Sequence, residues 1–461
     1  MIYSCVVDPQ PAFVHQLAIW AATLTGLAAV RRDAIVVHVL DGEYRREAVE
    51  LLDERGIAHR PLARFGDGRY CNKIAQLRDP ALRAARYVAL CDTDLAFCGP
   101  LEPYAAGGIA AKPVDLPNPP LALLTDLYRR AGFVRLPPVT RCTHDDAPTF
   151  ANNCNGGVYL VRSDLLEALA PRWERWALWT LERAALLGEH AKHADQIAFG
   201  LATWDLGEPV VPLPPEANFP LHLPLERYRR PAAAPVVMHY HDRIGADGFV
   251  LPLGIPPADE RVRKVNEFLR GEQREGFDNA RFWNFRYETH PELGSGLGSR
   301  GPHAAEKRRL LRTLIAAGAP ESVLDVGCGD LHVAHDLPVA NYLGLDVSAE
   351  AIRIARERRP DWRFAVGDLL SAELAPADLV VCLDVLIHER DPERYRAAVR
   401  RLAELTRREL VIAAYNQPPW LTSAMTFYHE PITMTLAACD GFAGLEIVGG
   451  YRDTTVVRAS R

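Results

Sequence analysis

The stretch Val323-Leu324-Asp325-Val326-Gly327-Cys328-Gly329-Asp330 is an apolar segment that runs directly into a glycine turn. Glycine permits such a tight turn and lets a bound molecule lie against the backbone. Asp346 ends the next expected strand, 19 residues after Gly327, where a carboxylate can accept hydrogen bonds from ribose hydroxyls. Asp368 ends the strand after that. The pattern predicts a doubly wound α/β domain that binds an adenosine-containing cofactor.

NAD and S-adenosylmethionine both place a ribose against such an acid, so this acid does not distinguish them. The sequence of the glycine turn does. A dinucleotide fingerprint requires Gly-x-Gly-x-x-Gly, with the pyrophosphate at a helix N-terminus. Here His332 stands where the third glycine would be, and Asp330 would put a negative charge near the phosphates. The methionine part of S-adenosylmethionine carries an ammonium, which tolerates acids such as Asp325 and Asp330. The turn therefore favours S-adenosylmethionine over NAD.

Residues 280–461 resemble the class I S-adenosylmethionine-dependent methyltransferases, and Cys382–His388 is similar to the fourth-strand segment of that family. The resemblance implies a set of cofactor-binding residues: Asp325, Gly327, Gly329, Asp346, Asp368 and Asp384. Methyl transfer needs alignment of the reactants and, for an oxygen acceptor, a base. His388 is the candidate catalytic base, with Asp384 as the alternative.

The glycine- and serine-rich stretch 294–299 has two interpretations. It is typical of a flexible linker. However, the aromatic run Phe282–Tyr287 before it requires a packed surface, and the two segments together resemble a leader found in some bacterial methyltransferases. The expected domains are therefore residues 1–255, a junction and leader at 256–300, and a methyltransferase domain at 301–461.

The first half of the chain also alternates expected strands and helices, which predicts a second, mostly parallel α/β sheet. The expected strand 86–90 ends in Cys91-Asp92-Thr93-Asp94. Asp92 and Asp94 are two residues apart, so in a strand they share a face at its carboxyl end. Two hard oxygen ligands suit Mn²⁺ or Mg²⁺ bound to a diphosphate. Residues 100–150, rich in proline and glycine, are expected to be long loops over this site.

Three further segments accompany the acidic pair: Asn152–Arg162, His193–Phe199 and Val236–His241. In this order the four segments resemble the GT-A glycosyltransferases, in particular the glycogenin-like and lipopolysaccharide galactosyltransferase group, over residues 1–250. The resemblance implies a metal site of Asp92, Asp94 and His239, with His241 as the second choice for the histidine. It also implies donor-binding residues, Lys73, Asp92, Asp94, Asn155, Gly156 and Gln196, and Asp195 as a catalytic candidate.

The chain departs from this family at the end of the domain. The family's ending His-x-x-Gly-x-x-Lys-Pro-Trp is absent, because His239 is followed by Tyr240, His241 and Asp242. The phosphate-binding lysine of that ending is therefore missing, and Arg243 is the candidate replacement.

Composition limits the classes of function. The 461 residues carry a net charge of −6, so a chain-wide basic surface for nucleic acid is absent. The apolar segment Leu17–Val30 is too short to span a bilayer and is expected to be a buried helix. The nine cysteines include no Cys-x-x-Cys, which indicates reduced thiols and a cytoplasmic protein.

The expected protein is thus two Rossmann-like α/β domains, a GT-A fold followed by a class I methyltransferase fold. We expect a bifunctional enzyme that transfers a sugar from a nucleotide sugar, such as a UDP-sugar, and a methyl group from S-adenosylmethionine. Its acceptor would be a glycan or a small molecule, in the assembly of a bacterial surface glycan or glycosylated metabolite. One alternative is a methyltransferase with a degenerate glycosyltransferase domain that only binds glycan. Another is two independent activities joined for co-expression.

Overall fold

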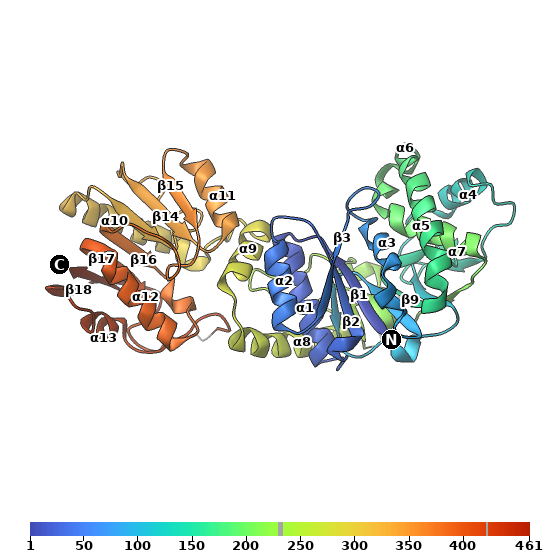
Figure 1. Ribbon diagram of the computed structural model, residues 1–461, viewed down its shortest axis with the longest axis horizontal. Helices are drawn as coiled ribbons and strands as arrows, with labels where there is room; N and C mark the ends of the chain where they lie inside the picture. The colour runs from blue at the N-terminus through green and yellow to red at the C-terminus, as the bar shows by residue number, and fades with distance from the viewer. Residues whose placement is uncertain (229–233, 421–422) are drawn as a thin grey trace. The chain divides into compact units, whose positions relative to one another are not determined.

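The computed structural model describes residues 1–228, 234–420 and 423–461. These residues form two compact units, Met1–Leu269 and Arg270–Arg461, which are described separately (Figure 1). Within the described residues, no helix has the length and apolar character needed to cross a membrane.

The N-terminal unit is built on a seven-stranded sheet in the order β10-β6-β9-β4-β1-β2-β3. The strands are β1 (Ile2–Val7), β2 (Ile35–Leu40), β3 (Ala58–Leu62), β4 (Tyr87–Cys91), β6 (Ile109–Pro113), β9 (Cys154–Arg162) and β10 (Val210–Pro212). The sheet is mostly parallel, as expected, but β9 runs antiparallel to both β4 and β6. From β1 the chain continues to β2 and β3 on one side, whereas β4 lies on the other side of β1, parallel to it. In open α/β sheets, ligands bind at the carboxyl edge beside such a switch in strand order.

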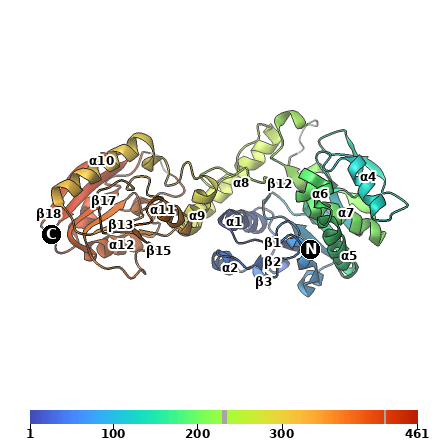
Figure 2. The ribbon, with the colours of Figure 1, turned by 90° about the horizontal axis from the view of Figure 1, so that it is seen from above.

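Helices cover both faces of this sheet. Figure 2 shows α1 (Pro11–Gly26) and α2 (Arg45–Glu54) on one side of β1–β3, with α5 (Leu166–Leu181) and α7 (Ala194–Leu206) on the other. The short helices of the unit are α3 (Asn72–Ala75), α4 (Leu121–Arg130) and α6 (Ala184–Leu187). Trp173 of α5 and Phe199 of α7 pack on Tyr159 of β9 in the larger core.

A second, three-stranded sheet lies in the order β11-β12-β5 and comprises β11 (Phe219–Pro220), β12 (Val237–His239) and β5 (Leu95–Phe97). β12 pairs antiparallel with β5, so that His239 is opposite Leu95. This pairing brings the end of β12 beside Asp94, although about 145 residues of sequence separate them. A two-stranded sheet of β7 (Val139–Arg141) and β8 (Pro148–Phe150) completes the unit.

Two expectations for this unit were wrong. The sequence pattern of residues 73–85 predicts one continuous helix, but α3 ends at Ala75 and two 3₁₀ turns follow, Gln76–Arg78 and Pro80–Arg83. Asp79 precedes a proline, which disfavours helical backbone, and its side chain instead accepts a hydrogen bond from the Ala81 N–H. Residues 100–150 are not only loops, because they contain β6 and α4.

The C-terminal unit has a seven-stranded sheet in the order β15-β14-β13-β16-β17-β19-β18. The strands are β13 (Val323–Val326), β14 (Tyr342–Asp346), β15 (Arg363–Val366), β16 (Ala377–Leu383), β17 (Thr406–Ala414), β18 (Gly444–Tyr451) and β19 (Thr454–Ser460). β19 runs antiparallel to both β17 and β18, and the pairs from β15 to β17 are parallel.

Alternate residues of β13 enter different cores of this unit. Val323 packs with α10 (Gly301–Gly318) and α11 (Ala349–Arg358) on one face. Leu324 packs with α12 (Pro392–Glu404) and α13 (Ile432–Ala437) on the other. A sheet covered by helices on both faces confirms the doubly wound architecture expected for this half of the chain.

Two helices lie where the sequence predicted a junction. α8 (Pro256–Glu275) contacts α1, because a Cβ on Gly26 would lie 2.2 Å from the ring of Phe268. α9 (Asn279–Thr289) packs on α11 instead. α9 and the 294–299 segment thus belong to the C-terminal unit, whereas most of α8 belongs to the N-terminal unit.

Candidate functional site

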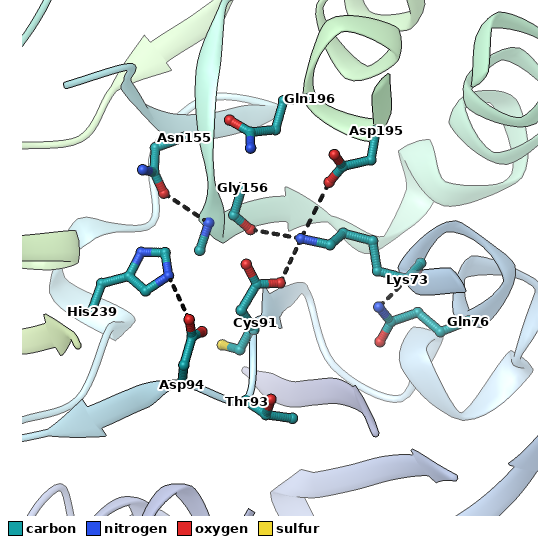
Figure 3. A network of polar contacts seen from close by, with 12 residues as sticks. Lys73, Gln76, Cys91, Thr93, Asp94, Asn155, Gly156, Asp195, Gln196 and His239 are labelled. Atoms are coloured by element: carbon teal, nitrogen blue, oxygen red, sulfur yellow. Dashed lines mark hydrogen bonds and ion pairs between the residues drawn. The ribbon is translucent and has the colours of Figure 1, made fainter. Parts of the chain in front are cut away.

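The crevice at the end of β4 contains a buried ammonium between two carboxylates. Nζ of Lys73 lies 2.5 Å from Oδ1 of Asp92 and 3.4 Å from Oδ2 of Asp195, and it donates to the Gly156 carbonyl at 3.2 Å (Figure 3). Burial alone would lower the pKa of Lys73, but the two carboxylates outweigh it and hold the pKa above its ordinary value. Burial raises the pKa of Asp195 to about 6, against the opposing effect of Lys73.

A second group of polar side chains lies beside the first and centres on Asp94. One ligand atom each from Asp94, His239 and His241 lies within 4.8 Å of the others. Nε2 of His239 is 3.2 Å from Oδ2 of Asp94, and Nδ1 of His241 is 3.5 Å from the same oxygen. Carboxylate and imidazole groups in this arrangement can bind a divalent cation.

The expected donor-binding residues on β9 join these two groups. Asn155 Oδ1 accepts from the Gly157 N–H at 2.9 Å and from Nδ2 of Asn218 at 3.0 Å. A Cβ on Gly157 would lie 2.6 Å from Nδ1 of His239, so the absence of a side chain there makes room for the imidazole. Gln196 lies at the start of α7, with its Cγ 3.3 Å from the position of a Cβ on Gly156.

The sequence did not single out three residues of this region. Lys112 and Asp115 form a buried ion pair of 2.5 Å at the end of β6, and Asp115 also accepts from Nδ2 of Asn155. Burial lowers the pKa of Lys112 despite Asp115. The sequence does contain a signal for Asp115, because this acid follows an apolar strand, and the same pattern identified Asp92. Asn218 carries no comparable signal, because its role depends on the pairing of β11 with β12.

The glycine turn of the C-terminal unit has left-handed backbone at Gly327, with φ of 74°, and at Gly329, with φ of 56°. A Cβ on Gly327 would lie 2.0 Å from the Val385 side chain, so only glycine fits. Asp346 accepts hydrogen bonds from the Gly329 N–H at 2.9 Å and the Ser348 N–H at 2.8 Å. The turn and the acid at the end of β14 therefore form one hydrogen-bonded unit.

Three other expected cofactor residues have partners in this unit. Oδ2 of Asp325 accepts from the Tyr342 hydroxyl at 2.6 Å. Asp368 pairs with Arg394 at 2.7 Å. Asp384 has left-handed backbone, with φ of 63°, and pairs with Lys307 at 2.6 Å. Burial raises the pKa values of Asp325 and Asp346, each to about 6.

His388 has one ring nitrogen with an assigned partner. Nδ1 lies 2.7 Å from the carbonyl oxygen of Met425, which can only accept, so Nδ1 carries the hydrogen and Nε2 keeps a lone pair. Burial lowers the pKa of His388, which keeps the imidazole neutral near pH 7. The Trp283 ring of α9 lies edge-on at 5.1 Å. This state of the imidazole is the one that a general base requires.

The 294–299 segment lies against the glycine turn. A Cβ on Gly329 would be 2.6 Å from both the Tyr287 hydroxyl and Oγ of Ser295, which are hydrogen-bonded to each other. Oδ1 of Asn284 accepts from Oγ of Ser348 at 2.8 Å, next to Asp346. The aromatic helix and the glycine-serine segment thus pack on the cofactor-binding turn.

The comparisons with known proteins concern methyltransferases. Residues 323–409 match the family model of a methyltransferase domain. Magnesium-protoporphyrin O-methyltransferase of Rhodobacter capsulatus is 29% identical over 204 residues, which are 42% of this chain and 72% of that protein.

Two solved structures are similar in part to this chain. N-methyltransferase NodS of Bradyrhizobium japonicum WM9 has a TM-score of 0.31 and 20% identity, covering 35% of this chain and 98% of its own. Magnesium protoporphyrin IX methyltransferase of Synechocystis PCC 6803, solved with bound SAM, has a TM-score of 0.30 and 21% identity, covering 42% and 91%. On the match of the family model, the C-terminal unit of this α/β protein contains a methyltransferase domain.

Proposed function

We propose that the C-terminal unit transfers a methyl group from S-adenosylmethionine to a small-molecule or glycan acceptor. The observation that carries this proposal is the hydrogen bond between the Gly329 N–H and Asp346, which joins the glycine turn to a carboxylate able to bind ribose hydroxyls. When bound, the cofactor supplies an activated methyl group on a sulfonium. By the resemblance to class I methyltransferases, Asp325 would be a partner for the ammonium of the cofactor, and Asp368, two residues after β15, would lie beside adenine.

His388 is the proposed base of this reaction. Its Nδ1–H is held by the Met425 carbonyl, so Nε2 can take a proton from an acceptor hydroxyl. Asp384 is engaged by Lys307 and by the Tyr451 hydroxyl at 3.0 Å, which favours a supporting role for this carboxylate and His388 as the base. Substitution of His388 and of Asp384, each followed by measurement of methyl transfer to an acceptor, tests both assignments.

Titration of the full chain with S-adenosylhomocysteine tests the cofactor assignment. We expect one equivalent to bind, and a concentration of 100 times the dissociation constant to stabilise the binding unit by about 2.7 kcal/mol. NADH should leave the melting temperature unchanged. Binding of NADH without binding of S-adenosylhomocysteine would contradict the proposal.

For the N-terminal unit, we propose a metal-dependent glycosyltransferase that uses a nucleotide sugar such as a UDP-sugar. The supporting observation is that Lys73 joins Asp92 to Asp195 beside a separate Asp94–histidine group. An Mn²⁺ or Mg²⁺ ion held there would neutralise charge on a leaving diphosphate. Asn155, Gly156 and Gln196 lie where they can contact the sugar. The comparisons support the methyltransferase half, and this second half rests on the geometry alone.

The alternative is a methyltransferase whose N-terminal unit binds glycan without turnover. Hydrolysis of a panel of nucleotide sugars in the presence of Mn²⁺ separates the two functions. Turnover that is lost in both Asp92→Ala and Asp94→Ala, with S-adenosylhomocysteine binding unchanged, supports the glycosyltransferase. Binding of glycan without hydrolysis of any donor supports the alternative.

A further inference from the structure

Two imidazoles and a carboxylate form a compact cluster at the end of β12. The rings of His239 and His241 are stacked, with centroids 4.0 Å apart and planes 15° apart. A third imidazole, His222, lies edge-on to His241 at 3.8 Å. The side chain of His239 is 3% exposed and that of Asp94 is 16% exposed. Two protonated rings at this distance would repel each other, whereas a neutral imidazole has a lone pair that can bind a cation.

Several polar atoms of the cluster lack a hydrogen bond. Oδ1 of Asp94 and Nε2 of His241 are buried and accept or donate none within the described residues. Nε2 of His239 approaches Asp94 at 3.2 Å without hydrogen-bond geometry. A buried polar atom left without a partner destabilises the folded protein. A cation held by one ligand atom each of Asp94, His239 and His241, which lie within 4.8 Å of one another, would give this polar cluster a partner.

The other side of the His239 ring is already oriented. Its Nδ1 lies 3.2 Å from Oδ1 of Asn218, whose Nδ2 donates to Asn155. With Nδ1–H directed at an amide oxygen, the lone pair of the ring lies on Nε2, toward Asp94. Histidines that bind metals usually donate their second ring nitrogen to an oxygen in this manner.

The backbone at His241 is strained. Its φ of 53° lies in the left-handed region, which is unfavourable for a residue that has a side chain. The neighbouring contacts hold it there: the Tyr240 N–H donates to the Asp94 carbonyl at 3.0 Å, and Gln16 donates to the His241 carbonyl at 3.3 Å. Strain of this kind persists where it places a side chain for a purpose.

Asp92 is engaged elsewhere. Its Oδ1 is 2.5 Å from Nζ of Lys73, a buried ammonium, and it is not among the three residues whose ligand atoms converge. A carboxylate neutralised by an ammonium has less charge to offer a cation. Asp92 therefore holds Lys73 between the two acids, which leaves His241 as the third candidate ligand.

We propose that Asp94, His239 and His241 bind one divalent transition-metal ion, and that Asp92 is not a ligand in the donor-free protein. Two nitrogens and one carboxylate favour Mn²⁺, Co²⁺ or Zn²⁺ over Mg²⁺, which prefers oxygen ligands. The role of this ion in sugar transfer rests on the function proposed above, whereas the ligand set does not.

Titration of the full chain with Co²⁺, followed by its visible absorption and by calorimetry, tests the ligand set without any donor. We expect one equivalent to bind, with an absorption band shifted by nitrogen ligation, and a 100-fold excess of Mg²⁺ not to displace it. His241→Asn keeps a residue that tolerates left-handed backbone and should weaken binding by more than about tenfold. Asp94→Asn should do the same, and Asp92→Asn should leave the affinity within about twofold.

His59→Ala is the matched control, because this histidine pairs with Asp53 at the exposed edge strand β3. Equal losses in Asp92→Asn and Asp94→Asn, with none in His241→Asn, would overturn the proposal in favour of Asp92, Asp94 and His239. Absence of the Co²⁺ band in a wild-type protein that melts cooperatively would also overturn it. A normal titration in a protein that turns over no nucleotide sugar leaves the metal site intact and contradicts only the glycosyltransferase.

Discussion

Nζ of Lys307 in α10 lies 2.6 Å from Oδ2 of Asp384 at the end of β16, and the Lys307 side chain is only 1% exposed. The ammonium also donates to Oγ of Ser299 at 3.1 Å. This contact joins the segment before α10 to the strand that borders the cofactor-binding turn. The backbone of Asp384 itself is left-handed, with φ of 63°.

Loss of this ammonium should destabilise the C-terminal unit strongly. Lys307→Met leaves the Asp384 carboxylate partly buried and without its cation, and breaking a buried pair from one side costs about 3–5 kcal/mol. Urea denaturation followed by tryptophan fluorescence measures the loss. Arg309→Met is the control on the same helix, because its pair with Glu306 is exposed, and it should leave the midpoint unchanged.

Cofactor binding should depend on Asp346. Asp346→Ala removes a carboxylate that bonds to the Gly329 and Ser348 N–H groups and can bind ribose hydroxyls. We expect S-adenosylhomocysteine to bind about 1.5–3 kcal/mol more weakly, the range for hydrogen bonds to a charged group. Calorimetry gives the difference, with Asp361→Ala as the control, because Asp361 forms an exposed pair with Arg359. Unchanged affinity in Asp346→Ala would show that this carboxylate does not contribute to cofactor binding.

The sequence was most informative where structure and function are local. The apolar strand, the glycine turn and the acid that ends β14 lie within 24 residues, from Val323 to Asp346, and each expectation for their structure agrees with the backbone. The acidic segment after β4 is local in the same way. Short-range patterns of this kind carry their own physical signal.

Long-range contacts could not be predicted in the same way. His241 meets Asp94 only because β12 pairs with β5, and Asn218 meets His239 only because β11 pairs with β12. Asp115 accepts from Nδ2 of Asn155 only because β6 lies against β9. Strand order in a mixed sheet is set by tertiary packing, which single-sequence patterns do not encode.

Cofactor affinity should rise with pH through the range near 6. Burial raises the pKa of Asp325 to about 6, whereas an unfolded aspartate titrates near 3.9. The folded protein therefore holds a proton that the unfolded chain lacks between these values, so its unfolding free energy falls as pH rises through this window. The ionised carboxylate formed above pH 6 binds the ammonium of the cofactor better. Calorimetry from pH 5 to 8 should show this, and Asp325→Asn should flatten the profile only in part, because burial also raises the pKa of Asp346 to about 6.

The aromatic leader should contribute to cofactor binding. Residues 282–299 cover Gly329 and contact Ser348 beside Asp346. A fragment of residues 270–461 should bind S-adenosylhomocysteine like the full chain, and a fragment of residues 301–461 about tenfold more weakly, which corresponds to about 1.4 kcal/mol. Calorimetry compares the two fragments once both show a cooperative melt. Equal affinities would mean that the segment acts only as a linker.

Removal of one negative charge at Asp195 should separate sugar transfer from metal binding. Asp195 is 3% exposed, its Oδ1 has no hydrogen bond within the described residues, and its Oδ2 lies 3.4 Å from Lys73. Asp195→Asn keeps the volume of the side chain but removes a base or nucleophile, so nucleotide-sugar turnover should fall by about 10²–10⁴-fold. Co²⁺ affinity should not change, because the carboxylate is outside the group formed by Asp94 and the two histidines. Asp205→Asn on the same helix is the control, since its pairs with Arg172 and Arg175 are on the surface, and it should retain full turnover. If both variants retained full turnover, Asp195 would have no chemical role and Lys73 would serve only to neutralise Asp92.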